Sequence, residues 1–258
     1  MMLDTRETRA SACEVKFLID GRLAPRLREW AREHLDADPH GGGAFGDEYT
    51  TSTIYFDTTG LDVFHRRNSF GRAKYRVRRY GSSDVVFFER KLRKPGVLIK
   101  RRTIDGLGEM ARLEAEEADP AWQAHWFQRR VQVRRLRPVC QVTYERTARI
   151  GSTADGLARM TLDTSLRAVP VERPSFVMAP GVAFFEGQAI LELKYRARVP
   201  AVFRRLIEEF ALTPDTASKY RLALAAIRPA DGEGAREAYR SGDAPPSRVA
   251  PGRTGACA

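Results

Sequence analysis

Three consecutive segments within residues 74–103 place basic side chains at every second position. They are residues 74–80, 85–91 and 97–103, and the intervening turns read Gly-Ser-Ser-Asp and Lys-Pro-Gly. Short β-branched and aromatic runs joined by tight turns predict an antiparallel meander of three strands. Because successive strand side chains point to opposite faces, the basic residues of all three strands are expected on one shared face.

The shared face consists almost entirely of cations. It holds Lys74, Arg76, Arg78, Lys91, Lys100 and Arg102, together with the carboxylate of Glu89. Alternating charges usually mark the solvated side of a half-buried sheet, but such a side mixes signs because like charges on neighbouring strands destabilise each other. A face this basic favours a phosphate ligand, since Arg grips phosphate oxygens in pairs and Lys supplies a compact charge. Glu89 is then a candidate metal ligand, because carboxylates hold the divalent cations that accompany phosphate chains.

The overall charge also indicates an anionic partner. The chain has 258 residues, with 44 Lys and Arg against 33 Asp and Glu, for a net charge of +11. Three cysteines lie far apart and without the spacing of a metal site. No apolar run has the length of a membrane span, and the N-terminus lacks the apolar region of a signal peptide. We therefore expect a soluble, cytoplasmic protein without a membrane span.

The remaining patterns predict further strands and amphipathic helices in one domain, residues 12–228. Strands are expected at 13–19, 49–57, 138–150, 158–163 and 189–195, and helices at 23–35, 58–67, within 106–135, at 200–210 and at 216–227. Residues 1–11 are expected to be a disordered N-terminus. Residues 229–258 are rich in Gly, Pro, Ala, Ser and Arg, a composition typical of a disordered tail.

The alternating charges favour a closed sheet over an open one. An open sheet would leave its charged face flat to water, whereas a barrel gathers the same side chains in its lumen under helices packed outside. Unpaired buried charge costs several kcal/mol, so a lumen rich in cations requires water and an anionic ligand. The expected fold class is α+β, with an antiparallel barrel that forms a tunnel for phosphate.

A series of short motifs in this order resembles the VTC domain, the catalytic domain of vacuolar transporter chaperone-type polyphosphate polymerases. The motifs are Glu14-x-Lys16, Ser52-Thr-Ile-Tyr55-Phe-Asp57, Lys74-Tyr-Arg76-x-Arg78-x-Tyr80-Gly81, Glu89-x-Lys91, Lys100-x-Arg102, Tyr144-x-Arg146, Arg159-x-Thr161-x-Asp163, Glu192-x-Lys194 and Ser218-Lys219-Tyr220. This domain is one of the triphosphate tunnel metalloenzymes, which include the CYTH-like triphosphatases. The resemblance covers residues 12–228.

The resemblance implies an eight-stranded antiparallel β-barrel, the triphosphate tunnel, that works with Mn²⁺ or Mg²⁺. It implies a phosphotransferase that moves the terminal phosphoryl group of ATP onto inorganic polyphosphate. The phosphate-binding residues would be Lys16, Arg76, Arg78, Lys91, Lys100, Arg102, Arg146, Arg159, Lys194 and Lys219. Of these, Arg76, Arg78, Lys91 and Lys100 would act in catalysis with Glu192, and Glu192, Glu89 and Glu14 would be the metal ligands.

Two departures from the family pattern bear on function. The chain has neither the helical SPX domain nor the transmembrane segments of fuller eukaryotic members, so the resemblance implies neither regulation nor translocation. The first strand carries a single Glu-x-Lys rather than the doubled Glu-x-Glu-x-Lys of the CYTH branch, which favours a polymerase. The alternatives are a metal-dependent triphosphatase and a non-catalytic polyphosphate-binding module. Nucleic acid is not expected, because the cations alternate along strands instead of covering an outer face.

Overall fold

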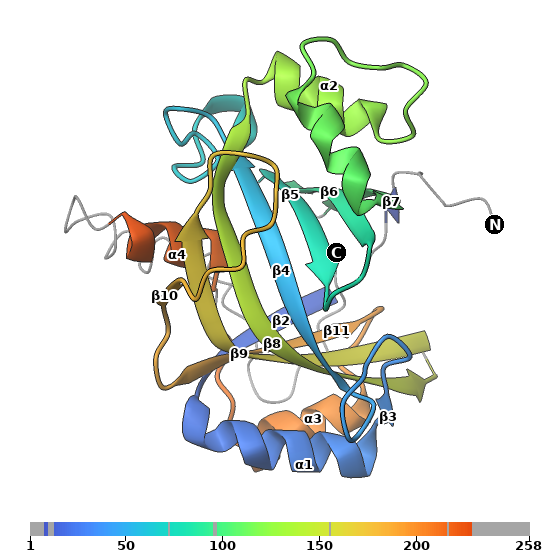
Figure 1. Ribbon diagram of the computed structural model, residues 1–258. Helices are drawn as coiled ribbons and strands as arrows, with labels where there is room; N and C mark the ends of the chain where they lie inside the picture. The colour runs from blue at the N-terminus through green and yellow to red at the C-terminus, as the bar shows by residue number, and fades with distance from the viewer. Residues whose placement is uncertain are drawn as a thin grey trace.

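The computed structural model describes residues 8–9, 13–71, 73–94, 97–154, 156–215 and 217–228. One antiparallel sheet of eleven strands dominates the fold, in the order β1-β7-β6-β5-β4-β8-β9-β11-β2, with β3 on β8 and β10 on β9 (Figure 1). Three strands have two residues each, namely β1 (Thr8–Arg9), β3 (Asp36–Ala37) and β10 (Val182–Ala183). The eight long strands that remain (eleven less three) confirm the expected α+β class with an eight-stranded antiparallel core.

The long strands include the basic meander at its expected place. They are β2 (Cys13–Asp20), β4 (Glu48–Asp57), β5 (Ala73–Tyr80), β6 (Val85–Lys94), β7 (Val97–Gly106), β8 (Arg137–Thr153), β9 (Gly156–Pro170) and β11 (Gln188–Tyr195). The pairing of Arg76 with Glu89, and of Glu89 with Arg102, sets the register of β5, β6 and β7. The predicted basic face is therefore continuous across three strands.

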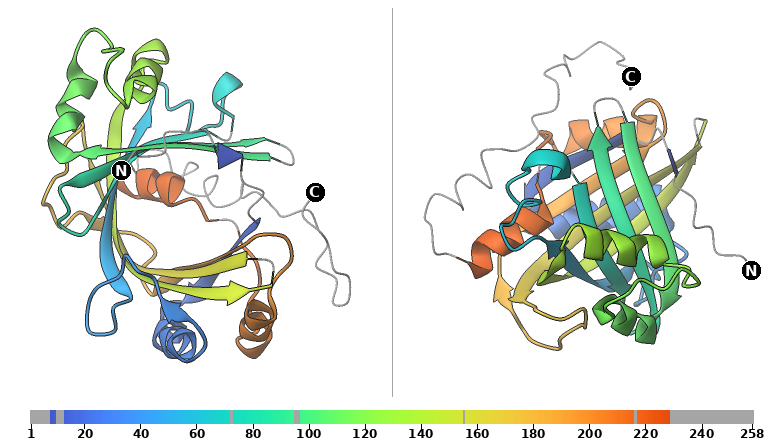
Figure 2. Two further views of the ribbon diagram at one scale, coloured as in Figure 1. Left: turned by 90° about the vertical axis from the view of Figure 1, so that its right-hand side faces the viewer. Right: turned by 90° about the horizontal axis from the view of Figure 1, so that it is seen from above.

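The sheet curls strongly but its strand ladder does not form a ring. Its arms face each other, so that β6 and β7 lie opposite β11 and β2, with α4 (Lys219–Ile227) between them (Figure 2). Within the described part of the chain, no pairing joins β2 to β7 or β1. The outer edge of β7 is instead paired with β1, whose Thr8 lies opposite Lys100. The eight long strands therefore form the expected curled antiparallel sheet, but among the described residues its ladder is not closed into a ring, and β1 pairs with Ile99 and Lys100 at the outer edge of β7.

The β1 strand also changes the expected domain limits. Thr8–Arg9 were expected in a disordered N-terminus, but they pair with β7, whose open edge offers unpaired backbone groups. Residues 1–7, 10–11 and 229–258, which complete the two segments expected to be disordered, lie outside the described residues, as does residue 12.

Two hydrophobic clusters cover the outer side of the curled sheet. One contains Val77 of β5 and Phe88 of β6, and it packs against α2 (His125–Val133) and the 3₁₀ helix Leu107–Glu114. The other joins β2, β9 and β11 to α1 (Ala24–His34) and α3 (Ala201–Glu209), which lie side by side in Figure 1. Both faces of the strands are thus occupied. The predicted basic face is the inner, concave one, whereas Arg101 and Asp105 contact Trp126 and Trp122 on the outer side.

Candidate functional site

The inner face of the meander is organised by one buried carboxylate. Glu89 is 1% exposed and accepts hydrogen bonds from Arg76 Nε and Arg102 Nε, both at 2.7 Å, while Lys100 Nζ lies 3.3 Å from Oε1. Burial alone would raise the pKa of Glu89, but the charges of Arg76 and Lys100 hold it well below the usual range. Glu89 therefore stays ionised and fixes three of the predicted phosphate-binding residues in place.

A second group crosses from β6 to β2 and β11. Lys91 Nζ donates to both carboxylate oxygens of Glu14, at 3.0 and 3.1 Å, and Lys16 Nζ lies 3.2 Å from Glu14 and 3.3 Å from Glu192. Lys194 also forms an ion pair with Glu192. Burial opposes ionisation of Glu192, but the charges of Lys194 and Lys16 keep its pKa well below the usual range. Predicted residues from three strands thus meet in one lysine-rich group.

The predicted metal ligands do not form a single group. Glu14 and Glu192 share the ammonium group of Lys16, whereas both oxygens of Glu89 are held by arginines and a lysine. Among the described residues, no cluster of three His, Cys, Asp or Glu side chains could hold a metal ion. Glu14 and Glu192 nevertheless fit a hard divalent cation such as Mg²⁺ or Mn²⁺, because carboxylate oxygens suit it and phosphate or water can complete its ligands.

A third carboxylate anchors the middle of the inner face. Asp163 of β9 is fully buried and accepts two hydrogen bonds from the Arg146 guanidinium, at 2.6 and 2.8 Å, while Lys219 Nζ lies 2.6 Å away. Burial alone would raise the pKa of Asp163, but Arg146 and Lys219 lower it to about 2. Lys219 stands at the first position of α4, which Ser218 caps by accepting from the Arg221 N–H. The capped helix therefore places Lys219 inside the curled sheet.

Arg159 lies at the edge of the same face and has different partners. Its Nε donates to Asp38 Oδ2 at 2.7 Å, and its Nη2 donates to the Tyr49 hydroxyl at 2.9 Å. The structure thus joins eight of the ten predicted phosphate-binding residues into three carboxylate-centred groups. Arg159 lies in a separate contact beside them, and Arg78 belongs to none of the three groups.

Arg78 differs from the other cations of the inner face. It is 6% exposed, and its Nε donates to Thr53 Oγ1 at 3.2 Å. Its guanidinium lies 5.9 Å from the centre of the Tyr80 ring. Within the described ranges, no carboxylate forms an ion pair with Arg78. A buried cation without a carboxylate partner is costly, so this position favours an anionic ligand.

Burial and nearby positive charge together shift the pKa values of three neighbouring groups. Burial, followed by the charges of Lys16 and Lys91, puts the pKa of Lys74 well below its usual range. Burial lowers the pKa of Lys100 to about 8, although Glu89 opposes the change. Burial would raise the pKa of Tyr80, but the field of Arg78 dominates and lowers it to about 7. All three shifts are of the kind that a bound polyanion would relieve.

Sequence reasoning predicted Glu14, Glu89 and Glu192 as metal ligands but predicted no carboxylate as the ion-pair partner of the cations. Asp163 was seen only as part of a motif, and Asp38 was not singled out. Asp57, quoted in another motif, accepts a hydrogen bond from the buried Tyr220 hydroxyl and ties α4 to the end of β4. The sequence does show a two-residue alternation that puts Arg159, Thr161 and Asp163 on one face of a strand. It does not show which cations these residues contact, because that depends on the register between strands.

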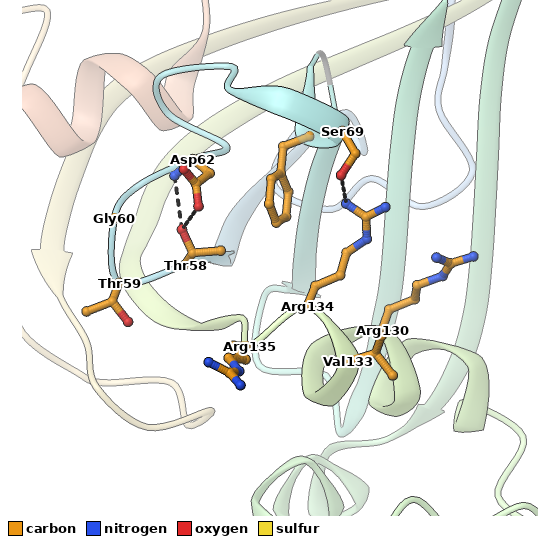
Figure 3. Close-up of a pocket in the computed structure, with 10 residues that line it drawn as sticks. Thr58, Thr59, Gly60, Asp62, Ser69, Arg130, Val133, Arg134 and Arg135 are labelled. Atoms are coloured by element: carbon orange, nitrogen blue, oxygen red, sulfur yellow. Dashed lines mark hydrogen bonds between the residues drawn. The ribbon is translucent and has the colours of Figure 1, made fainter.

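A separate surface cavity of about 540 Å³ lies outside the inner face, between the loop after β4 and the end of α2 (Figure 3). Arg130, Arg134 and Arg135 line it, and Arg134 Nη1 donates to Ser69 Oγ at 3.1 Å. Arg130 and Arg135 are exposed, and no carboxylate of the described residues pairs with them. In Figure 3 the side chains of Arg130 and Arg135 point in different directions. The cavity is therefore basic, but the side chains of Arg130 and Arg135 do not point toward a common ligand position.

Comparison with known proteins identifies the family of this chain. A family model of the VTC domain matches residues 11–228. The chain belongs to the VTC-domain family. The match covers the eight long strands, α4 and every side chain of the three carboxylate-centred groups, and no curated protein matches the chain. No helix in the described part of this VTC-domain protein is long and apolar enough to cross a membrane.

Several solved structures are similar to the VTC domain at low sequence identity. A Bacillus halodurans protein provisionally described as an adenylate cyclase is 14% identical, with a TM-score of 0.49 over 81% of this chain and 95% of its own. A Hippeastrum protein, provisionally described as an adenylyl cyclase with a dominant triphosphatase activity, is 11% identical, with a TM-score of 0.44 over 86% and 97%. A Vibrio parahaemolyticus protein with the first description is 11% identical, with a TM-score of 0.44 over 83% and 98%.

Proposed function

We propose that this VTC-domain protein is a polyphosphate polymerase that transfers the terminal phosphoryl group of ATP to a growing phosphate chain on its inner face. The observation that carries the proposal is Arg78, a buried guanidinium without a carboxylate partner among the described residues, between Arg76 and Tyr80 on one strand. An anion placed there would meet the Arg76 and Arg102 guanidinium groups as well. Such forks match the paired oxygens of a phosphate.

Phosphoryl transfer requires little covalent participation by the protein. The bond from the terminal phosphorus to the bridging oxygen of ADP breaks, and a bond to an oxygen of the acceptor phosphate forms. Positioning and charge neutralisation supply most of the catalysis. In this proposal Arg76, Arg78 and Arg102 bind the phosphate oxygens, while Lys91 and Lys100 neutralise charge on the leaving side. A divalent cation held by Glu14 and Glu192 would withdraw further charge from the transferred group.

The cationic side chains of the inner face are held in fixed positions, which favours catalysis over simple binding of anions. Arg76, Arg102 and Lys100 are held by Glu89, and Arg146 and Lys219 are held by Asp163. Donors that are already oriented need little reorganisation when charge develops during the reaction. The pair Glu14 and Glu192 adds a candidate metal site, which a simple phosphate-binding surface does not require.

The test is incubation of the purified protein with ATP and either MnCl₂ or MgCl₂, with products resolved on a gel. A ladder of long phosphate chains is the expected result. Release of free phosphate without chains would make the protein a triphosphatase, in which water is the acceptor at the same site. Tight binding of polyphosphate without turnover would identify a binding module. Either of these two results would overturn the polymerase proposal.

A further inference from the structure

The basic inner face ends in a group of aromatic rings where β4 begins, β5 ends and β6 begins. We call Tyr49, Tyr80 and Phe87 the aromatic end. The centroid of the Tyr80 ring lies 5.4 Å from that of Tyr49 and 5.1 Å from that of Phe87, in edge-to-face contacts. Tyr80 and Phe87 stand two residues from Arg78 and Glu89, which lie on the inner face, and Tyr49 stands four residues before Thr53, which contacts Arg78.

The aromatic end differs from the other rings of this face in exposure. Tyr144 and Tyr220 are each 1% exposed, and Tyr55 is buried in a stacked pair with Tyr220. The three rings of the aromatic end are only partly buried and lie beside the exposed turn of residues 81–84. They therefore offer partly exposed aromatic surface at one end of a cationic track.

Arginines connect the aromatic end to that track. The guanidinium of Arg102 lies 4.7 Å from the centre of the Phe87 ring, and the guanidinium of Arg78 lies 5.9 Å from that of Tyr80. Along β5, Arg78 and Arg76 follow Tyr80 at two-residue steps of about 7 Å each. A ligand that stacks on the rings would thus have cations directly beside it on one side.

We propose that the aromatic end docks the base of the substrate nucleotide, with its phosphates running over Arg78 and Arg76 toward Glu14 and Glu192. The inference rests on the proposed function, in which ATP is the phosphoryl donor. Inorganic polyphosphate is charged along its whole length, and uncharged rings offer it no matching group. A nucleoside triphosphate has a flat base at one end, and aromatic rings and guanidinium planes both stack on bases.

The inference assigns a function to each part of the inner face. The aromatic end selects a nucleotide over inorganic triphosphate, and the cations bind the phosphates that both ligands share. Selectivity should then depend on the rings, whereas affinity for tripolyphosphate should depend on the arginines and lysines. This division can be measured because the two ligands differ only beyond the triphosphate.

The experiment is isothermal titration calorimetry with ATP and with inorganic tripolyphosphate, on the parent and on Phe87→Leu, Phe87→Ala and Phe45→Ala. Phe87→Leu keeps apolar bulk and removes the ring, and Phe45 is an aromatic control, 61% exposed and stacked on Arg32 outside the inner face. We expect both Phe87 variants to raise the Kd for ATP about tenfold and to change the Kd for tripolyphosphate less than twofold. Phe45→Ala should change neither.

Different outcomes separate this inference from the proposed function. If Phe87→Leu lowered the affinity for both ligands equally, or left the affinity for ATP unchanged, base docking would be overturned. The polymerase proposal would not be affected, because the gel assay tests it separately. If the Phe87 variants lost affinity for ATP alone, and the parent released only free phosphate from ATP, base docking would be supported and the polymerase proposal overturned. A parent that binds tripolyphosphate but not ATP would overturn both. Melting temperatures of the two Phe87 variants show whether each is folded before its Kd is interpreted.

Discussion

The inner face and the surface cavity of Figure 3 are both rich in arginine, yet their arginines are held in different ways. On the inner face Arg76 and Arg102 share Glu89, and Arg146 is bound by both oxygens of Asp163. In the surface cavity Arg130 and Arg135 are exposed and have no carboxylate partner in the described ranges. The first arrangement fixes direction, whereas the second leaves side chains free to rotate in water.

The difference shows that a high local count of arginines does not define a site. Exposed charges are screened by salt over about 10 Å, and each long side chain loses rotamer freedom on binding. Cations that buried carboxylates already hold have lost that freedom during folding. The same residue type can therefore bind phosphate strongly on the inner face and weakly at the surface cavity.

The largest expected effect is on turnover in Glu192→Gln. The change keeps the shape of the side chain and removes one of the two carboxylates that fit a metal, so several kcal/mol of charge stabilisation is lost. We expect turnover to fall about a thousandfold, with the Kd for polyphosphate within about tenfold of the parent, because Lys16 and Lys194 remain. The matched control is Glu186→Gln, an exposed glutamate outside the inner face. Full activity in Glu192→Gln would remove Glu192 from the metal site.

The next prediction concerns stability at the Asp163 anchor. Asp163→Asn leaves Arg146 and Lys219 buried without their carboxylate, which should cost about 3–5 kcal/mol of unfolding free energy in a urea titration. The control is Asp20→Asn, whose pair with Arg22 is exposed and screened by water, so its loss should change stability far less. Similar losses in the two variants would show that the inner-face anchors are no better fixed than surface pairs.

The same anchor predicts a pH dependence. The pKa of Asp163 is lowered from 3.8 to about 2, so its contribution to stability is complete above pH 3.8 and is lost as the pH falls toward 2. The unfolding free energy of the parent should therefore fall over this range by more than that of Asp163→Asn. Parallel pH profiles for the two proteins would contradict the assignment.

Two variants test the comparison directly, each removing one arginine, from the inner face or from the surface cavity. Arg78→Met should weaken tripolyphosphate binding about tenfold or more, since it removes a charged hydrogen-bond donor. The ligand-free variant should lose little stability, because Arg76, Lys100 and Arg102 still pair with Glu89 when Arg78 is removed. Arg135→Met, in the surface cavity, should change binding less than twofold.

Thermal shift provides the readout for both variants. A ligand that binds only the folded state adds about 2.7 kcal/mol at a hundredfold excess over Kd. Tripolyphosphate should raise the melting temperature of the parent and of Arg135→Met by more than sulfate at equal ionic strength. If Arg78→Met and Arg135→Met responded alike, the contrast between the two regions would be wrong.

The smallest expected effect is a change of affinity with pH. The pKa of Tyr80 is about 7, so above this pH the phenol carries a negative charge that repels a bound polyanion. Affinity for tripolyphosphate should therefore fall a few-fold more in the parent than in Tyr80→Phe as the pH rises from 6 to 8. Comparing the two proteins cancels the titration of the ligand. Tyr195→Phe is the control, because burial raises the pKa of Tyr195.

The basic meander was predictable because it combines three local signals, namely alternation, turn residues and β-branched runs. The open edge of the sheet was not predictable, because the partner of β7 is a strand of only two residues without a pattern of its own. The carboxylate partners of the arginines were also hidden, since Glu89 and Asp163 acquire them only through strand register.

The segment after β4 shows how a side chain can override a periodic pattern. A helix was expected at residues 58–67, but Asp57 accepts hydrogen bonds from the backbone N–H groups of Thr58, Val63 and Phe64. These bonds hold a turn with left-handed backbone at Leu61, which ends any helical run. The helical expectation is therefore wrong, and the apolar spacing of the segment reflects burial of Val63 and Phe64.

The separate edges of the curled sheet have a consequence for substrates that are long polymers. A ring of hydrogen-bonded strands can be entered only by threading a free chain end through it. Within the described residues β2 and β7 have no shared ladder, and the side chains of Lys91 and Glu14 make the contact between the arms. Ion pairs exchange partners without breaking a backbone ladder. Under the proposed function, we therefore expect polyphosphate to load sideways at an internal position as well as by end-first entry.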